Sequence, residues 1–312
     1  MIARLAPAQS SGPYRVADSI VITGFDRSYG DFYAIDVKHR RLYGADHKVV
    51  NIDTKQIVAQ IADSMAGGGF MLAPELGRGV VRDGTIFDLE TAAVVGHVDV
   101  LYGDGTTYDP ATERAFLFRN DTVAAIDVKA GTLVGTVAVD DAGESGVADG
   151  TGKLYLNLHK RDSIAVLDAK TLTRVGGFSI APCKAPMGLA MDRVHRRLFA
   201  ACDGALGVID ADKGTVVATV PTGGYTDQNA FDPGTGLIFM PNGSENGVVI
   251  IHEDTPDRYT VVQRLMNPAL SEGHSNKIVV DEQTHRAYVP SYRSRTKTRT
   301  DLVYVVLEPV KR

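Results

Sequence analysis

Short apolar segments alternate with polar turn segments along the whole chain. The apolar runs are separated by clusters of Asp, Gly, Asn and Lys, and Val, Thr and Ile are frequent within them. No stretch keeps the apolar spacing of an amphipathic helix for three turns. Short β-strands joined by tight turns produce this alternation, so the pattern predicts an all-β protein.

A unit of four such segments repeats along the sequence. Two clear copies begin at Phe32 (FYAIDVKHRRLYGADHKVVNIDTKQIVAQI) and at Gly188 (GLAMDRVHRRLFAACDGALGVIDADKGTVVATV). The first strand of each unit is expected to end at Asp36, Pro74, Asp109, Asp149, Asp192, Asp232 and Asp281. This spacing averages about 41 residues, and units of roughly 40 to 50 residues with four strands are typical of β-propeller blades. The sequence therefore predicts a seven-bladed β-propeller of four-stranded antiparallel blades.

The two ends of the chain predict how the ring closes. The seventh unit stops after its third strand, LVYVVLEP, whereas the segment YRVADSIVITGF from Tyr14 has a fourth-strand pattern and no strands before it. Pairing the two segments completes the last blade and covers two exposed strand edges. We therefore expect one propeller domain over residues 1–312, with an N-terminal tail (1–13), a closing strand of blade seven (14–25) and the blades (26–309).

Several segments carry a resemblance to a known family. The second strands contain LYGA, LYLN, LFAA and AYVP, and APELGRG, APCKAP and HEDTPDRYTVVQ occur elsewhere. In these segments the chain resembles the YncE-like, YVTN-repeat seven-bladed propellers of bacteria over nearly its whole length. The resemblance implies this fold and a periplasmic or exported protein, although MIARLAPAQSSGPY lacks the apolar segment of a signal peptide. It implies no particular activity, because a fold does not fix a function.

Composition and charge narrow the function classes. The net charge is −5 and acidic and basic residues are mixed, which disfavours a nucleic-acid partner. The apolar runs are far shorter than the roughly 18 residues of a membrane-spanning helix. The only cysteines, Cys183 and Cys202, fall in one unit and on one face. They could form a disulfide, as the exported relatives would favour, or stay reduced thiols, one of them metal-bound.

Blade topology divides the turns between two faces of the ring. The entry face carries the connections into each first strand and the turns between second and third strands. The opposite face carries the remaining turns, including those with His39, His195 and His285, which we interpret as solvated turn residues. Loops at the entry face are free to vary while the strands hold their position, so we expect the ligand there.

Acidic residues recur just before the first strands, at the expected channel mouth. Asp31, Asp104, Glu144 and Asp227 are predicted to form one ring, and Tyr29, Tyr102 and Tyr225 precede three of them in Tyr-x-Asp loops. Oxygen ligands of this kind would favour one divalent cation, calcium or magnesium. The alternatives are a hydrated acidic rim without an ion, or carboxylates that contact a basic ligand directly.

Other entry-face residues could act on a ligand. The turns between second and third strands supply His47, Arg82, Arg119 and His159, whose cations could orient an anionic substrate or only balance the acidic ring. Glu272 and His274 have a Glu-x-His spacing similar to that of the virginiamycin B lyase family. That likeness implies His274 as a general base, but the partner histidine that the family places one blade earlier is missing.

Two hypotheses about function follow from these residues. In the first, the propeller binds a small molecule or peptide at the channel mouth on the face that bears the Tyr-x-Asp loops. In the alternative, it is a metal-assisted hydrolase or lyase that acts on a lactone or similar anionic small molecule at the same site. The acidic ring would hold the cation, His274 or His159 would move a proton, and Arg82 or Arg119 would orient the substrate.

Overall fold

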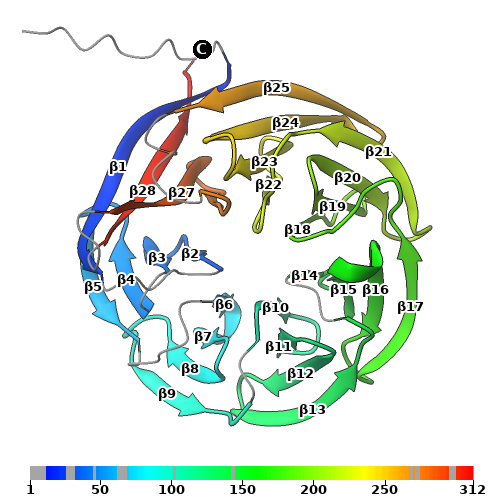
Figure 1. The fold of residues 1–312 in the computed structure, drawn as a ribbon. Coiled ribbons are helices and arrows are strands. Elements are labelled where there is room, and N and C mark those ends of the chain that lie inside the picture. The colour runs from blue at the N-terminus through cyan, green and yellow to red at the C-terminus, as the bar shows by residue number, and fades with distance from the viewer. Residues whose placement is uncertain are drawn as a thin grey trace, which may run out of the picture.

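The computed structural model of the chain describes residues 12–25, 32–44, 47–61, 69–100, 103–141, 145–267, 270, 275–294 and 300–311. The described strands form seven sheets of four antiparallel strands, arranged as blades around a common axis (Figure 1). The predicted all-β, seven-bladed propeller is confirmed. Within these ranges no helix is both long and apolar enough to cross a membrane.

Each blade runs from a short inner strand to an outer strand. The first four blades are β2 (Ala34–Asp36), β3 (Arg41–Tyr43), β4 (Lys48–Asn51), β5 (Gln56–Gln60); β6 (Phe70–Ala73), β7 (Arg78–Val81), β8 (Thr85–Asp88), β9 (Val94–His97); β10 (Gly105–Asp109), β11 (Arg114–Arg119), β12 (Thr122–Asp127), β13 (Thr132–Ala138); and β14 (Gly146–Ala148), β15 (Lys153–Leu158), β16 (Ser163–Asp168), β17 (Thr173–Ser179). The last three are β18 (Leu189–Asp192), β19 (Arg197–Cys202), β20 (Ala205–Asp210), β21 (Thr215–Pro221); β22 (Ala230–Asp232), β23 (Leu237–Asn242), β24 (Gly247–Thr255), β25 (Arg258–Met266); and β26 (Val279–Asp281), β27 (Arg286–Ser294), β28 (Thr300–Pro309), β1 (Tyr14–Phe25). The short 3-10 helices η2 (Pro74–Leu76) and η3 (His159–Arg161) follow β6 and β15.

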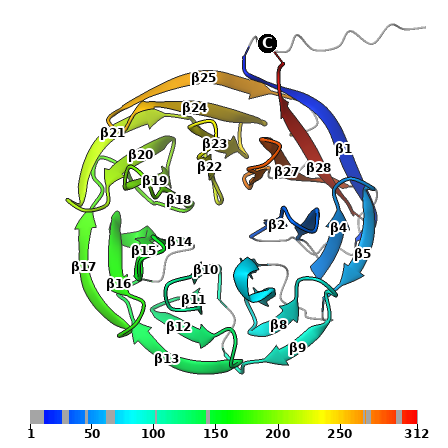
Figure 2. The ribbon, with the colours of Figure 1, turned by 180° about the vertical axis from the view of Figure 1, so that it is seen from behind.

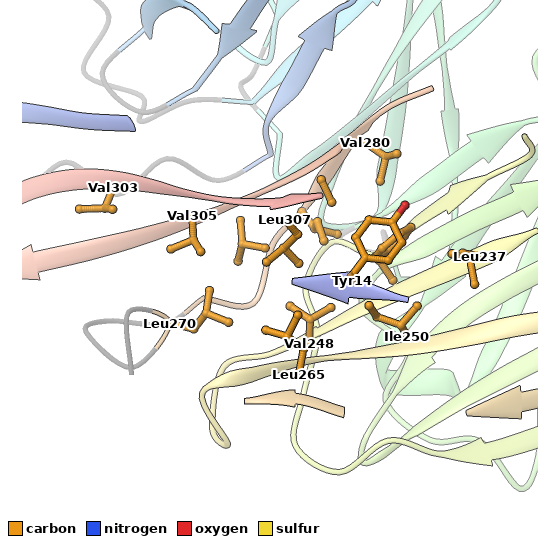
Figure 3. Close-up of a cluster of buried hydrophobic side chains, with 14 residues drawn as sticks. Tyr14, Leu237, Val248, Ile250, Leu265, Leu270, Val280, Val303, Val305 and Leu307 are labelled. Carbon is orange, nitrogen blue, oxygen red and sulfur yellow. The ribbon is translucent and has the colours of Figure 1, made fainter. Parts of the chain in front are cut away.

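The N-terminal strand closes the ring, as the sequence predicts. Strand β1 pairs antiparallel with β28, from Tyr14 opposite Pro309 onward, and both views of the ring show the two strands side by side (Figures 1 and 2). Tyr14 also anchors blade seven to blade six, because its ring meets that of Phe239 edge-on at 5.1 Å. Figure 3 shows this ring among aliphatic side chains of both blades. Closure therefore buries apolar surface as well as pairing an edge.

Blade five carries a covalent link. A disulfide joins Cys183 and Cys202, whose Cα atoms lie 5.7 Å apart. Both cysteines are buried, in a cluster formed by side chains of blades four and five. Of the two states that the sequence left open, the structure has the disulfide, which ties the loop before β18 to the end of β19.

In six blades a buried aspartate lies at the end of the innermost strand. In each, a carboxylate oxygen accepts a backbone N–H from the turn that follows, and the side chain is almost fully buried in Asp36, Asp109, Asp149, Asp192, Asp232 and Asp281. Asn and Asp side chains stabilise turns in this way. The recurring aspartate seen in the sequence is therefore a turn-forming residue on the opposite face.

A second set of contacts links these aspartates to the next blade. Each following turn contains a residue with a positive φ, and in three turns the side chain of that residue reaches back to the preceding blade. The contacts are Arg40 to Asp281 at 2.6 Å, Arg196 to Asp149 at 2.9 Å and His285 to Asp232 at 2.8 Å. His285 therefore makes a hydrogen bond to the neighbouring blade, where we expected a solvated turn residue.

Replacing Arg196 by alanine should destabilise the ring, because it leaves the buried carboxylate of Asp149 without its cation. We expect a loss of about 2 kcal/mol in the free energy of unfolding at pH 7, measured by urea denaturation. The control Arg258→Ala removes an exposed partner 3.3 Å from Asp254 and should cost less than about 0.5 kcal/mol.

The same effect should depend on pH. Burial alone would raise the pKa of Asp149, but backbone N–H groups and the Arg196 guanidinium together lower it below its usual value. The stability that Asp149 contributes is present above its unfolded pKa of about 4 and is lost as the pH falls through its folded pKa. The cost of Arg196→Ala should therefore shrink in acid, and a cost independent of pH would contradict this account.

Candidate functional site

The loops before the inner strands form the mouth of the ring on the entry face. At blades two and three this mouth carries an arginine and a carboxylate, with Arg82 Nη1 3.9 Å from Oδ1 of Asp104. Gly69 leaves room for the arginine, since a Cβ built there would lie 2.6 Å from Cδ of Arg82. Gly69 occupies the place where other blades have the predicted acid. Blade two therefore contributes a cation to the mouth instead of a carboxylate.

Blades six and seven hold the second charged pair. Asp227 accepts a hydrogen bond from the amide of Asn276 and contacts Lys277 Nζ at 2.8 Å. The side chains of Lys277 and Asp227 are only 13% and 20% exposed, so the pair is partly shielded from solvent. Both described members of the predicted acidic ring, Asp104 and Asp227, therefore lie beside a cation.

The side chain of Gln228 links blade six to blade one at the mouth, across the loop of blade seven. The side-chain amide of Gln228 donates to the carbonyl of Tyr33 at 2.9 Å and accepts from its backbone N–H at 3.1 Å. The backbone N–H groups of Asp227 and Gln228 both donate to the carbonyl of Asn276 in the intervening blade. Three blades therefore meet through hydrogen bonds at this side of the mouth.

Tyr225 lies beside this network. A Cβ added at Gly243 would lie 3.7 Å from Cζ of Tyr225 and 3.1 Å from Cβ of Asn276, so the ring packs close over the glycine. The tyrosine is half-buried, and its loop also holds Thr226, whose hydroxyl donates to the carbonyl of Pro241 at 2.6 Å. The Tyr-x-Asp loop of blade six therefore places a half-buried aromatic side chain near Asp227.

Two further predicted ligand-binding residues, His47 and Arg119, do not lie beside these charged pairs. His47 is 2% exposed and packs edge-on against Phe70 at 5.6 Å, as part of the core between blades one and two. Arg119 lines a cavity of about 380 Å³ together with Leu133 and Thr136 of the outer strand β13. The structure therefore places His47 in the core, and Arg119 beside the outer part of its blade.

His159, the described candidate base, stands at the start of η3. Its Nδ1 lies 3.3 Å from the carbonyl oxygen of Pro186. A hydrogen bond donated to that carbonyl keeps the proton on Nδ1, so that the neutral ring presents Nε2 as an acceptor. His159 is half-buried, and its hydrogen bond to Pro186 is the geometric observation that bears on its role as a base.

Six of the predicted site residues lie outside the described residues. They are the candidate catalytic residues His274 and Glu272, the tyrosines Tyr29 and Tyr102, and the acids Asp31 and Glu144. The acidic ring and the proposed cation within it therefore stay predictions.

One group of ionisable side chains was not predicted as a site from the sequence. Among the described residues, Asp192, His195 and Glu253 are the group of three whose potential metal-ligand atoms all lie within 4.8 Å of one another. His195 Nδ1 is 2.5 Å from Oδ2 of Asp192 and 3.6 Å from Oε1 of Glu253. Burial, and then the charge of Asp192, raise the pKa of Glu253 to about 7. The group lies on the opposite face, between blades five and six.

The comparison with solved structures supports the fold. No protein-family model matches the chain, and no curated protein is significantly similar to it. The chain is similar to the solved structure of U3-55K, with 11% identity and a TM-score of 0.75, over 94% of this chain and 100% of that one. It is also similar to the WD40 repeats of RRP9, with 10% identity and a TM-score of 0.77, over 96% of this chain and 99% of that one. A third similar structure is hydrazine synthase of Kuenenia stuttgartiensis, with 12% identity and a TM-score of 0.71, over 93% of this chain and 96% of that one. At such identities the likeness shows the seven-bladed fold alone, and the YncE-like family stays a prediction.

Replacing Gln228 by alanine should destabilise the mouth. Tyr33 is 2% exposed, so its backbone N–H and carbonyl would lose their partners in a buried place. We expect a loss of about 2 kcal/mol, and a fall in Tm of roughly 3 °C by calorimetry. Gln283→Ala, at an exposed turn position, is the control and should leave Tm within about 1 °C. Equal shifts in both variants would show that the Gln228 bridge adds no stability.

Proposed function

We propose that this chain is a binding propeller that holds a polar small molecule or peptide over the mouth on its entry face. The observation that carries the proposal is the pair of contacts Arg82–Asp104 and Lys277–Asp227. Each contact joins neighbouring blades, so the scaffold fixes charges of both signs at the mouth. Variable loops on a rigid frame are a common arrangement for binding sites.

The chemistry of these groups favours a ligand that itself carries both charges. A guanidinium offers a planar fork to a carboxylate, and an aspartate accepts hydrogen bonds from an ammonium group. Tyr225 adds an aromatic face and a hydroxyl next to the pair of Asp227. An amino acid or the end of a peptide chain supplies all the complementary groups.

The alternative, a metal-assisted hydrolase or lyase acting on a lactone or similar anionic small molecule, has one supporting observation. The hydrogen bond from His159 Nδ1 leaves Nε2 as an acceptor, the state that a general base requires. Its other base and acid, His274 and Glu272, are not among the described residues. The binding proposal therefore rests on more of the described site.

We predict that the affinity for a ligand depends on the two cations of the mouth, Arg82 and Lys277. Amino acids and short peptides would be screened by thermal shift, and any ligand found would be measured by titration calorimetry. Arg82→Gln and Lys277→Gln should each weaken binding at least about 10-fold, which corresponds to the loss of one charged hydrogen bond. Lys213→Gln, at a 75% exposed position on the opposite face, should not change the affinity.

Three results would contradict the proposal. They are the absence of any ligand in the panel, an affinity that the two mouth variants leave unchanged, and an equal loss in Lys213→Gln. Lactones and esters belong in the same panel as substrates. Turnover that disappears in His159→Ala would favour the enzyme instead.

A further inference from the structure

The boundary between blades five and six departs from the pattern of the other blades on the opposite face. Here two carboxylates and an imidazole converge, and the side chains of Asp192 and Glu253 are each only 4% exposed. His195, at 48% exposure, covers them from the solvent side. Buried carboxylates of like charge need a proton or a cation between them.

The glutamate is the first departure. Glu253 donates its backbone N–H to the carbonyl of the positive-φ residue of its blade, Gly236. In five other blades the residue that makes this same hydrogen bond is apolar and buried, namely Ile52, Leu89, Val128, Ala169 and Ala211. An apolar residue is therefore sufficient for the fold at this position, and the carboxylate of Glu253 is not needed for this hydrogen bond.

The second feature of this boundary is that no arginine reaches Asp192 from the next blade. In blades one and five the positive-φ residue is Arg40 or Arg196, whose guanidinium binds the aspartate of the preceding blade. Blade six has Gly236 there, with a φ of 67°, and it supplies no side chain to Asp192. Arg197, close by, contacts Asp210 and Asp257 instead. At this boundary the second carboxylate, that of Glu253, therefore lies beside Asp192, where the boundaries before blades one and five have an arginine.

Space for a ligand accompanies these two departures. A cavity of about 370 Å³ is lined by all three side chains and by Gly236, Phe231 and Pro233. Asp192 is held by the backbone N–H of Val194 at 2.8 Å, and Glu253 by the hydroxyl of Tyr259 at 3.2 Å. Both carboxylates are therefore fixed in position at the wall of an open cavity.

We propose that Asp192, His195 and Glu253 bind one divalent transition-metal ion, of which zinc is the representative, in the place of the absent guanidinium. The ligand atoms are Nδ1 of His195 and the two carboxylate oxygens that lie near it, Oδ2 of Asp192 at 2.5 Å and Oε1 of Glu253 at 3.6 Å. The three residues offer ligand atoms within 4.8 Å of one another, and the ion would replace the proton between Nδ1 and Oδ2. An imidazole nitrogen favours zinc and its neighbours over calcium and magnesium. The cavity leaves a fourth position for water or an external ligand. The site is independent of the function proposed for the entry face.

A related turn in blade one gives the matched control. His39 Nδ1 lies 2.6 Å from Oδ2 of Asp36, as in blade five, but its Nε2 lies 2.9 Å from Oε2 of Glu90. The two carboxylates therefore bind opposite nitrogens of the ring and do not converge on one point. The Asp-x-x-His turn alone does not make a metal site, and His39→Ala should leave metal binding unchanged.

The test is zinc binding by the full chain after removal of metals with a chelator. Mass spectrometry and titration calorimetry should find one tightly held zinc ion per chain, with a Tm raised by about 5 °C. Glu253→Ala, which installs the residue of blades four and five, should weaken binding by at least about 100-fold. Gly236→Arg, which installs the guanidinium of blades one and five, should abolish binding while the chain stays folded by circular dichroism.

A cobalt-substituted protein adds a readout that does not depend on stability. Cobalt should give visible absorption bands of a low-coordinate nitrogen and oxygen site in the wild type and in His39→Ala, and none in Glu253→Ala. The proposal is overturned if the wild type takes up no zinc, if only calcium or magnesium binds, or if Glu253→Ala and Gly236→Arg bind zinc as the wild type does.

Discussion

The ring depends on a buried carboxylate at the end of an inner strand. In blade four, one oxygen of Asp149 accepts hydrogen bonds from its own turn, and the other accepts from Arg196 of the next blade. The same group therefore ends a strand and joins two blades. Such a carboxylate has to stay ionised in a poorly hydrated place, which makes its cation partner part of the fold.

The partner of this carboxylate varies from blade to blade, and the variation distinguishes the boundaries. Where Arg40, Arg196 or His285 occupies the positive-φ position, the link runs between blades. Where the next blade has a glycine at that position, as Gly77 for Asp36 and Gly236 for Asp192, the histidine in the aspartate's own turn contacts the carboxylate instead. Strand pairing is thus common to all blades, while the charge balance at each boundary is individual.

The sequence predicts the fold well because its signals are local. The aspartates, the turns and the strand at Tyr14 each lie within one unit, and a period near 41 residues orders them. The site is less predictable because its contacts cross units. Gln228 and Tyr33 are 195 residues apart. The carboxylate of Glu253 stands out only when blades are compared by their backbone hydrogen bonds, because the residue that makes the same bond in five other blades is apolar.

Charge balance separates the two faces of the propeller. At the entry-face mouth the described carboxylates, Asp104 and Asp227, each have a lysine or arginine beside them, which suits recognition of a ligand with both charges. At the boundary of blades five and six, Asp192 and Glu253 share one histidine. Both arrangements occur in the same ring of four-stranded blades, so the two proposed sites, for an organic ligand on one face and a metal ion on the other, are compatible with one fold. The two activities would then be separable by mutation, because no residue named for one site contributes to the other.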